Sequence, residues 1–197
     1  MLIGLTGRAF SGKDTVADHL KRHHGFFKMA FADPLREGLK TLFGLGDWNF
    51  SPEGKGAVIP WIGQSPRQLM QSLGTEWGCD RVHPEIWCRH MDLRVRERAR
   101  TGHGLLVIPD IRFVEEARFV HSRGGQIWRV VRPDAQTTVH ADHSSEQEQN
   151  RIEEEVTLLN DGTLEQLFEQ VDELLDQAME EQAMEEMMMN TFQRNFS

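Results

Sequence analysis

A glycine-rich stretch near the start of the chain has the spacing of a phosphate-binding loop. In GLTGRAFSGKDT, Gly7 is followed by four residues and then by Gly12 and Lys13. Glycines let the backbone curl so that successive N–H groups face phosphate oxygens, and a helix that begins at about Lys13 adds its positive end. Apolar residues precede the stretch and an amphipathic segment follows it, which is the context that this motif requires. The alternative is a strand-to-helix glycine turn without a ligand. The residues expected to hold nucleotide phosphates are Gly7, Ser11, Gly12, Lys13, Asp14 and Thr15.

Asp14 departs from the usual pattern, in which Ser or Thr follows the lysine. A hydroxyl at that position would coordinate Mg²⁺ directly, whereas a carboxylate is a hard oxygen ligand that could hold Mg²⁺ through water. Negative charge is also favourable at the start of a helix. Thr15 supplies a hydroxyl one position later. The sequence therefore predicts a metal site formed by Asp14, through water, and Thr15.

Strands and helices alternate along the chain and would position this loop. Apolar runs that suit buried strands occur in MLIGL, FFKMAF, GLLVIPD, GGQIWRVVRP and EVTLLNDGT, with helical patterns between them. Apolar rather than alternating strands are typical of a parallel sheet covered on both faces. The prediction is an α/β fold of three layers, with a five-stranded parallel sheet and a small lid, in a single domain over residues 1–180. Residues 181–197 form an acidic, Met-rich tail that is expected to fray or to be disordered, and a partner-binding helix is the alternative.

Composition and charge exclude several classes of protein. The chain has 197 residues, of which 39% are hydrophobic and 27% charged, as in globular proteins. Its net charge is −9. Residues 1–139 contribute +5, from 20 Lys and Arg and 15 Asp and Glu, and residues 140–197 contribute −14, from 2 Arg and 16 Asp and Glu. The acidic end argues against general nucleic-acid binding. No run approaches the roughly 18 apolar residues of a membrane helix, and a secretion signal is not evident, which predicts a cytoplasmic protein without membrane contacts.

Several segments together give the chain a family resemblance. The pieces GKDT, FADPLR, SPRQLMQSLGTEWG, VIPDIRFVEEA, GGQIWRVVRP, DHSSE and NDGTLEQL, in this order, resemble the phage-type deoxynucleoside monophosphate kinases over about Leu2 to Val171. The resemblance implies a kinase of the phosphate-loop class that moves the γ-phosphate of ATP to a deoxynucleoside monophosphate, with Mg²⁺ as cofactor and a homodimer as a compatible state. It also implies a lid at about residues 133–152, in which Glu146 contacts substrate. Asn160 would border the adenine of ATP, unless it only forms a turn before the last helix.

Such a reaction brings two anions together, so arginines from separate segments should converge on one cleft. Arg132 and Asp110 are expected to be catalytic together with Lys13, and Arg8, Arg67 and Arg112 are expected to bind substrate. Asp33 would contact the acceptor or cap the helix that starts at Pro34, and each arginine could instead be a solvated surface residue. The arginine-rich run from Arg89 to Arg100 is interpreted as a solvated helix face. A zinc site in HADHSSE is not expected, because a fourth ligand is missing nearby.

Two other functions stay open from the sequence. The same donor site could serve another phosphorylated acceptor, such as phosphomevalonate or dephospho-coenzyme A, whose kinases share related architecture. A nucleotide-gated binding module with a protein partner on the acidic tail is the hypothesis of a different class. The sequence does not indicate which bases would be accepted.

Overall fold

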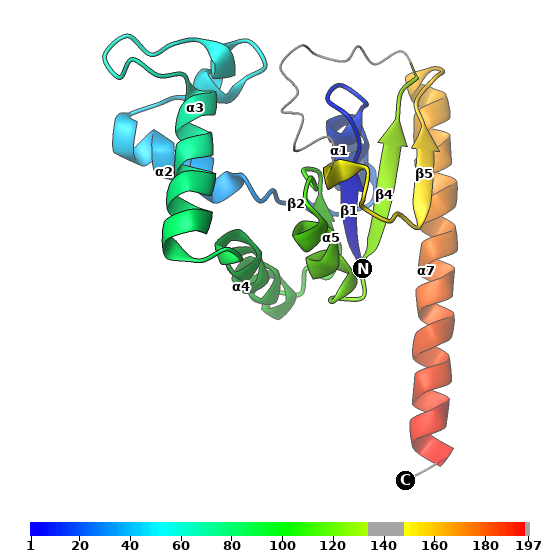
Figure 1. Ribbon diagram of the computed structural model, residues 1–197. Coiled ribbons are helices and arrows are strands. Elements are labelled where there is room, and N and C mark those ends of the chain that lie inside the picture. Colours follow the sequence, from blue (N-terminus) through cyan, green and yellow to red (C-terminus); the bar gives the residue numbers. More distant parts are fainter. Residues whose placement is uncertain (134–147, 196–197) are drawn as a thin grey trace. The chain divides into compact units, whose positions relative to one another are not determined.

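The computed structural model describes residues 1–133 and 148–195 and contains a five-stranded parallel sheet. The strands are β1 (Leu2–Thr6), β2 (Phe27–Lys28), β3 (Leu106–Ile108), β4 (Gln126–Val131) and β5 (Val156–Leu159). Their order across the sheet is β2-β3-β1-β4-β5 (Figure 1). The sequence prediction of a five-stranded parallel sheet is confirmed, although the second strand is shorter than the apolar run that predicts it.

The strand register places the functional loops at one edge of the sheet. Gly4 of the central strand β1 is paired with Ile108 of β3 and with Ile127 of β4. Because the strands are parallel, the loops that leave β1, β3, β4 and β5 all emerge at the same edge, where ligands bind in open α/β sheets. Thr6 and Arg129 form the last pair between β1 and β4.

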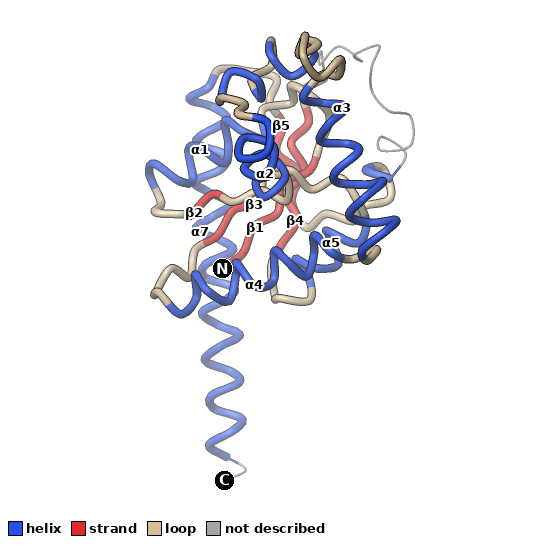
Figure 2. The backbone as a smooth tube through the Cα atoms, turned by 90° about the vertical axis from the view of Figure 1, so that its left-hand side faces the viewer, coloured by secondary structure: helices blue, strands red, loops and turns tan. Residues whose placement is uncertain are grey.

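Three helices surround the sheet. Helices α1 (Lys13–His23) and α7 (Leu164–Asn195) lie on one face, and α5 (Val114–His121) lies on the other (Figure 2). The core on the first face joins strand residues to Val16 and Leu20 of α1 and to Leu167 and Val171 of α7. On the other face, a side chain at Gly4 would collide with Ile127 and Val120, so the absence of a side chain there lets α5 approach the sheet.

The contacts within the chain define two compact units. The sheet, α1, α5 and α7 belong to residues 1–28 and 104–197, and residues 29–103 form the second unit. The prediction of a single domain over residues 1–180 stays a prediction. The second unit contains α2 (Asp33–Phe43), two short 3₁₀ turns, α3 (Pro66–Gln71), a π-helical segment (Ser72–Val82) and α4 (Ile86–Arg100). Leu39, Leu45, Ile59 and Leu69 form a small core of its own.

The start of α3 shows how the sequence specifies a helix end in this unit. The Ser65 hydroxyl accepts a hydrogen bond from the Gln68 N–H, and the Gln68 side chain accepts one from the Ser65 N–H at 2.9 Å. This reciprocal pair satisfies two backbone donors at the helix start, and Pro66 occupies the first helical position. Ser65 is thus the N-cap of α3.

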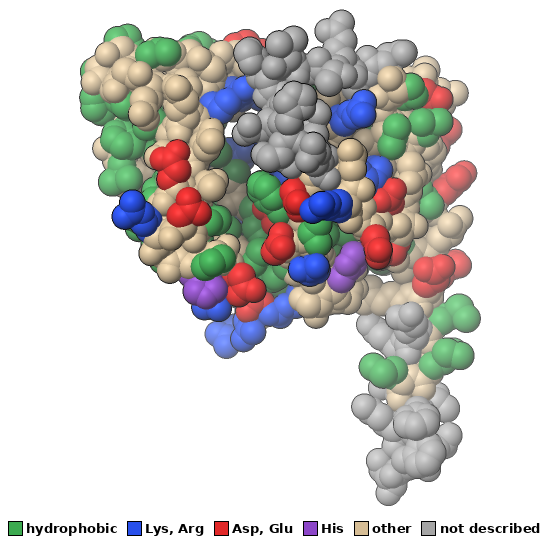
Figure 3. All heavy atoms as spheres, in the orientation of Figure 1, with side chains coloured by type: hydrophobic (Ala, Val, Ile, Leu, Met, Phe, Trp, Pro, Cys, Tyr) green, Lys and Arg blue, Asp and Glu red, His purple; other side chains and the backbone are tan. Residues whose placement is uncertain are grey.

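The acidic tail differs from its prediction. Helix α7 continues to Asn195, so residues 181–195 are helical where a frayed or disordered tail is expected. Figure 3 shows hydrophobic side chains on the part of α7 that extends past the sheet, and Met184, Met187, Met188 and Met189 are exposed there. None of the helices in the described residues is long and apolar enough to cross a membrane.

Candidate active site

The predicted phosphate loop joins β1 to α1 in a conformation that requires its two glycines. Gly7 has φ 135° and Gly12 has φ 107°, values that residues with side chains rarely adopt. A Cβ atom at Gly7 would collide with the backbone oxygen of Val130, and one at Gly12 would lie 2.6 Å from the side-chain amide of Asn160. The loop therefore runs against the ends of β4 and β5, and both glycines are needed for its path.

Lys13 lies folded over this loop. Its Nζ atom donates hydrogen bonds to the carbonyl oxygens of Gly7, at 2.6 Å, and of Arg8, at 2.7 Å. Burial, followed by the nearby charge of Arg112, lowers the pKa of Lys13 to about 8, although Asp14 and Asp110 oppose the shift. Within the described residues, this ammonium is partly buried and donates to two carbonyl oxygens. It would gain from a phosphate, because an anion restores the charge balance lost with the water.

Ser11 is buried in the loop, and its hydroxyl lacks a hydrogen-bond partner within residues 1–133 and 148–195. A buried hydroxyl without a partner costs free energy, which a ligand oxygen would recover. The Ser11 carbonyl, by contrast, accepts a hydrogen bond of 2.8 Å from the side-chain amide of Asn160. The Asn160 N–H donates to the Val131 carbonyl at 2.7 Å, so Asn160 fastens the loop to the end of the sheet. The adenine contact expected of Asn160 stays a prediction beside this supporting contact.

The loop after β3 brings Asp110 and Arg112 near Lys13, as the sequence predicts for residues at the sheet edge. Two hydrogen bonds fix it to β1: the Ile111 N–H donates to the Leu5 carbonyl, and the Thr6 hydroxyl donates to the Ile111 carbonyl, each at 3.1 Å. The charges of both Asp110 and Arg112 act on the pKa of Lys13. The exposed guanidinium of Arg112 is accessible to an anionic ligand.

Glu116 is a residue of this region that the sequence reasoning missed. One carboxylate oxygen, Oε2, accepts hydrogen bonds from the N–H groups of Arg112, at 2.7 Å, and Phe113, at 3.1 Å. Burial, followed by the charge of Asp110, raises the pKa of Glu116 to about 8 in spite of these donors. A Glu in the first turn of a predicted helix is the signal that could have identified it, because such a residue often reaches back to free N–H groups.

Asp14 makes a contact that the sequence does not indicate. Lys28, at the end of β2, donates hydrogen bonds to Asp14, at 2.8 Å, and to Asp18, at 3.0 Å. Burial would lower the pKa of Lys28, but the hydrogen bonds to the two carboxylates outweigh it, and the pKa is raised. Asp14 is 82% exposed, and Thr15 is partly buried beside it. The metal roles expected of Asp14 and Thr15 stay predictions.

In the second unit, Asp33 is held by a network rather than acting as a helix cap. It is the first residue of α2, and its Oδ2 accepts hydrogen bonds from the Ala30 N–H, at 2.7 Å, and from Arg94, at 2.9 Å. Arg94 also donates to the Ala30 carbonyl at 2.9 Å, and Arg36 lies 3.3 Å from the other carboxylate oxygen. Arg94 belongs to the run predicted to be solvated, and that prediction is wrong for this residue.

The other predicted site residues are exposed or lie outside the described part of the chain. Arg8 is exposed in the phosphate loop, Arg132 is exposed just after β4, and Arg67 is exposed in the first turn of α3 in the second unit. Their substrate contacts stay predictions. Glu146 and most of the lid expected at residues 133–152 lie outside the described residues, as does HADHSSE.

Comparison with known proteins supports a kinase site. The chain matches the family model "Deoxynucleotide monophosphate kinase" over residues 62–171. It is 33% identical, over 190 residues, to a protein of Acanthamoeba polyphaga mimivirus assigned to the deoxynucleotide monophosphate kinases, covering 90% of this chain and 97% of that protein. The deoxynucleotide monophosphate kinase of Enterobacteria phage T4 is 27% identical over 107 residues, which are 54% of this chain and 44% of the phage protein.

Likeness to solved structures is looser. Shikimate kinase from Aquifex aeolicus aligns with a TM-score of 0.49 and 16% identity, covering 91% of this chain and 98% of that one. Dephospho-CoA kinase from Campylobacter jejuni aligns with a TM-score of 0.47 and 11% identity, covering 89% and 96%. The assignment therefore rests on the sequence relatives, and the match to the mimivirus protein extends over nearly its whole length. The chain belongs to the deoxynucleotide monophosphate kinase family.

Proposed function

We propose that this chain transfers the γ-phosphate of ATP to a deoxynucleoside monophosphate at the edge of the sheet where Lys13 lies. The observation that carries the proposal is the pair formed by the partly buried Lys13 ammonium, which donates to the carbonyls of Gly7 and Arg8, and the buried Ser11 hydroxyl without a described partner. Both groups would gain from phosphate oxygens in the loop. Family membership supports a deoxynucleotide as acceptor over phosphomevalonate or dephospho-coenzyme A.

On the ATP side of the site, the loop would bind the phosphates and Lys13 would orient them. The N–H groups of the loop and the N-terminus of α1 would surround the β- and γ-phosphates. Lys13 would leave the carbonyls of Gly7 and Arg8 and bind phosphate oxygens, which raises its pKa from about 8 and keeps it charged. Asn160 keeps the Ser11 carbonyl fixed during this change, so the backbone of the loop does not need to rearrange.

The oxygen ligands near the loop suit Mg²⁺, although one of them already binds a lysine. The Thr15 hydroxyl and the Asp110 carboxylate are hard oxygen ligands of the kind that Mg²⁺ prefers. Asp14 is engaged with Lys28, so a contact to the ion through water would have to share its carboxylate with that lysine. When bound, the ion would neutralise charge on the phosphate oxygens.

On the acceptor side, positive charge rather than a base is required. The attacking group is a phosphate oxygen that is already an anion, so proton removal by the protein is unnecessary. Arg8, Arg112 and Arg132, all exposed in loops that leave the same edge of the sheet, would neutralise the two phosphates as they meet. Arg67 and Asp33, which belong to the second unit, stay candidate substrate-binding residues.

A coupled assay of ADP release, with each deoxynucleoside monophosphate in turn under saturating ATP and Mg²⁺, tests the proposal. Phosphomevalonate and dephospho-coenzyme A serve as competing acceptors. Turnover with at least one deoxynucleotide is expected, and Lys13→Ala should lower kcat at least about 100-fold. Lys21→Ala, an exposed lysine near the end of the same helix, is the matched control and should keep the rate. A near-normal rate for Lys13→Ala would show that the loop is misassigned.

A further inference from the structure

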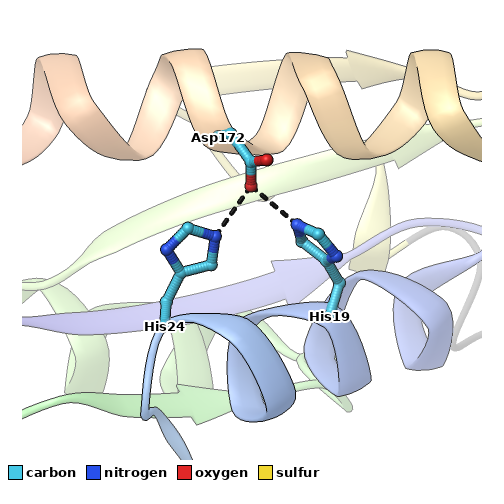
Figure 4. Close-up of side chains that lie close together, drawn as sticks. All are labelled: His19, His24 and Asp172. Carbon is cyan, nitrogen blue, oxygen red and sulfur yellow. Dashed lines mark hydrogen bonds and ion pairs between the residues drawn. The ribbon is translucent and has the colours of Figure 1, made fainter.

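Two histidines and an aspartate converge on one point between α1 and α7, away from the phosphate loop. The Nε2 atoms of His19 and His24 lie 2.6 Å and 2.7 Å from the same oxygen, Oδ1, of Asp172 (Figure 4). One ligand atom from each residue lies within 4.8 Å of the others. Asp172 lies 148 residues or more from the two histidines in the chain, so the fold itself brings it to them.

Packing fixes the most buried of the three. His19 is only 7% exposed, and its ring stacks on Phe168 of α7 with a centroid distance of 4.1 Å and an angle of 8° between planes. Its Nδ1 atom is buried and lacks a hydrogen-bond partner in the part of the chain that is described. A proton can therefore move from Nε2 to Nδ1 without breaking a hydrogen bond there, which leaves the Nε2 lone pair free to bind a cation.

We propose that His19, His24 and Asp172 form a binding site for a divalent transition metal, with Zn²⁺ as the ion that fits best. Imidazole nitrogen and carboxylate oxygen are ligands that zinc binds at about 2.0–2.2 Å, usually in tetrahedral geometry. Tetrahedral ligand atoms at that range stand about 3.3–3.5 Å apart. Each nitrogen therefore has to move less than about 1 Å away from the Asp172 oxygen, and the two nitrogens, which lie within 4.8 Å of each other, have to settle at the same separation. The ion takes the place of the two shared protons.

The surroundings suit an ion that arrives from solvent. Asp172 is 46% exposed and His24 is 25% exposed, so water can reach two of the three ligands. Water would fill the fourth position, or the exposed His23, whose ring centroid lies 4.8 Å from that of His19, would turn towards the ion.

The site would tie the helix that carries Lys13 to the last helix. Both helices contribute to one core on the same face of the sheet, and the ion would join them across that face. Because a metal that binds only the folded state adds its binding free energy to stability, Zn²⁺ should raise the melting temperature. The inference does not depend on the proposed function, and its test uses neither nucleotide nor turnover.

The test is calorimetric titration of the metal-free full-length protein with Zn²⁺ at pH 7.5, and with Mg²⁺ as a control ion. About one equivalent of Zn²⁺ should bind, and Mg²⁺ should not compete. His24→Gln and Asp172→Asn should each weaken Zn²⁺ binding at least about 100-fold, because each removes a direct ligand. Both side chains are partly exposed, so these variants should fold, which circular dichroism checks. His19→Gln is the third variant if it folds.

Matched controls exclude other histidines. His121→Gln removes a half-exposed histidine that pairs with Glu155, and His140→Gln with His143→Gln removes the pair in HADHSSE. Zn²⁺ affinity should be unchanged in both controls. Substitution by Co²⁺ should give the strong visible absorption of a four-coordinate ion, lost in Asp172→Asn. Full Zn²⁺ affinity in His24→Gln and Asp172→Asn, or no saturable binding by the native protein, would overturn the proposal and leave a hydrogen-bonded contact between the helices.

Discussion

The side-chain amide of Asn160 donates a 2.8 Å hydrogen bond to the carbonyl of Ser11, so the end of β5 holds the phosphate loop from behind. The same amide would lie 2.6 Å from a Cβ atom at Gly12. Asn160 thus supports the loop by occupying the space that a glycine leaves and by binding the backbone of the loop.

Replacing Asn160 should weaken ATP binding more than it weakens the fold. Asn160→Ala removes one hydrogen bond and opens space behind the loop, so we expect about tenfold weaker ATP affinity and a loss of about 1 kcal/mol in the free energy of unfolding. Calorimetric titration with a non-hydrolysable ATP analogue and chemical denaturation measure the two effects. Asn150→Ala, at an exposed turn, is the control. Unchanged affinity in Asn160→Ala would contradict a supporting role.

Glu116 should make stability fall as pH rises towards 8. Its pKa is raised from 4.5 to about 8, so the folded state binds more protons than the unfolded state between these values. Since stability then decreases with rising pH, we expect a decline on the order of 1–3 kcal/mol from pH 5 to 8. Glu116→Gln should flatten this decline, and Glu115→Gln, an exposed neighbour, should not. Urea denaturation across that pH range checks both variants, and an equal decline in all three proteins would exclude Glu116 as its source.

The sequence was sufficient to predict the sheet and the loop because both depend on local patterns. The apolar runs predict the strands, and the glycine spacing with Lys13 predicts the loop, whose glycines do adopt positive φ. Asp110 and Arg112 could be predicted too, because residues after parallel strands share one edge of the sheet. Each of these predictions needs only a short segment and a general rule of α/β folds.

Pairings between distant segments could not be predicted. The contact of Lys28 with Asp14 depends on where a two-residue strand ends, and that of Arg94 with Asp33 joins residues 61 positions apart. In sequence, Arg94 looks like its exposed neighbours Arg96 and Arg100, because its distinction is a partner on another helix. The same reason explains why the sequence raises HADHSSE as a possible zinc site, which is not expected to bind, whereas the described cluster joins α1 to α7.

Arg94 should matter for the acceptor through Asp33. Arg94→Ala would leave the Asp33 carboxylate without its 2.9 Å partner and the Ala30 carbonyl without its donor. We expect a loss of about 1–3 kcal/mol in stability and a higher KM for the deoxynucleotide, with KM for ATP nearly unchanged. Arg94→Lys should recover only part of this loss, because an ammonium does not reproduce the two-point contact of a guanidinium.

Initial-rate kinetics with both substrates varied measure the Arg94 effect. Arg96→Ala is the control, since Arg96 is exposed on the same helix and pairs with Asp92 one turn earlier. A rise in KM for ATP equal to that for the deoxynucleotide would show that Arg94 affects the whole protein rather than the acceptor side.

Asp14 provides the sharpest test of how Mg²⁺ is used. Asp14 is 82% exposed, so its ion pair with Lys28 contributes little to stability, about 0–1 kcal/mol. If Asp14 holds Mg²⁺ through water, Asp14→Ala should raise the Mg²⁺ concentration needed for half-maximal rate several-fold while leaving ATP affinity nearly unchanged. Asp14→Ser should restore Mg²⁺ use, because the hydroxyl can coordinate the ion directly.

Lys28→Ala separates this role from the ion pair. It should leave the Mg²⁺ dependence as it is or improve it, because the carboxylate is then released. If Lys28→Ala and Asp14→Ala shift the Mg²⁺ dependence equally, Asp14 acts through Lys28 and does not hold the ion.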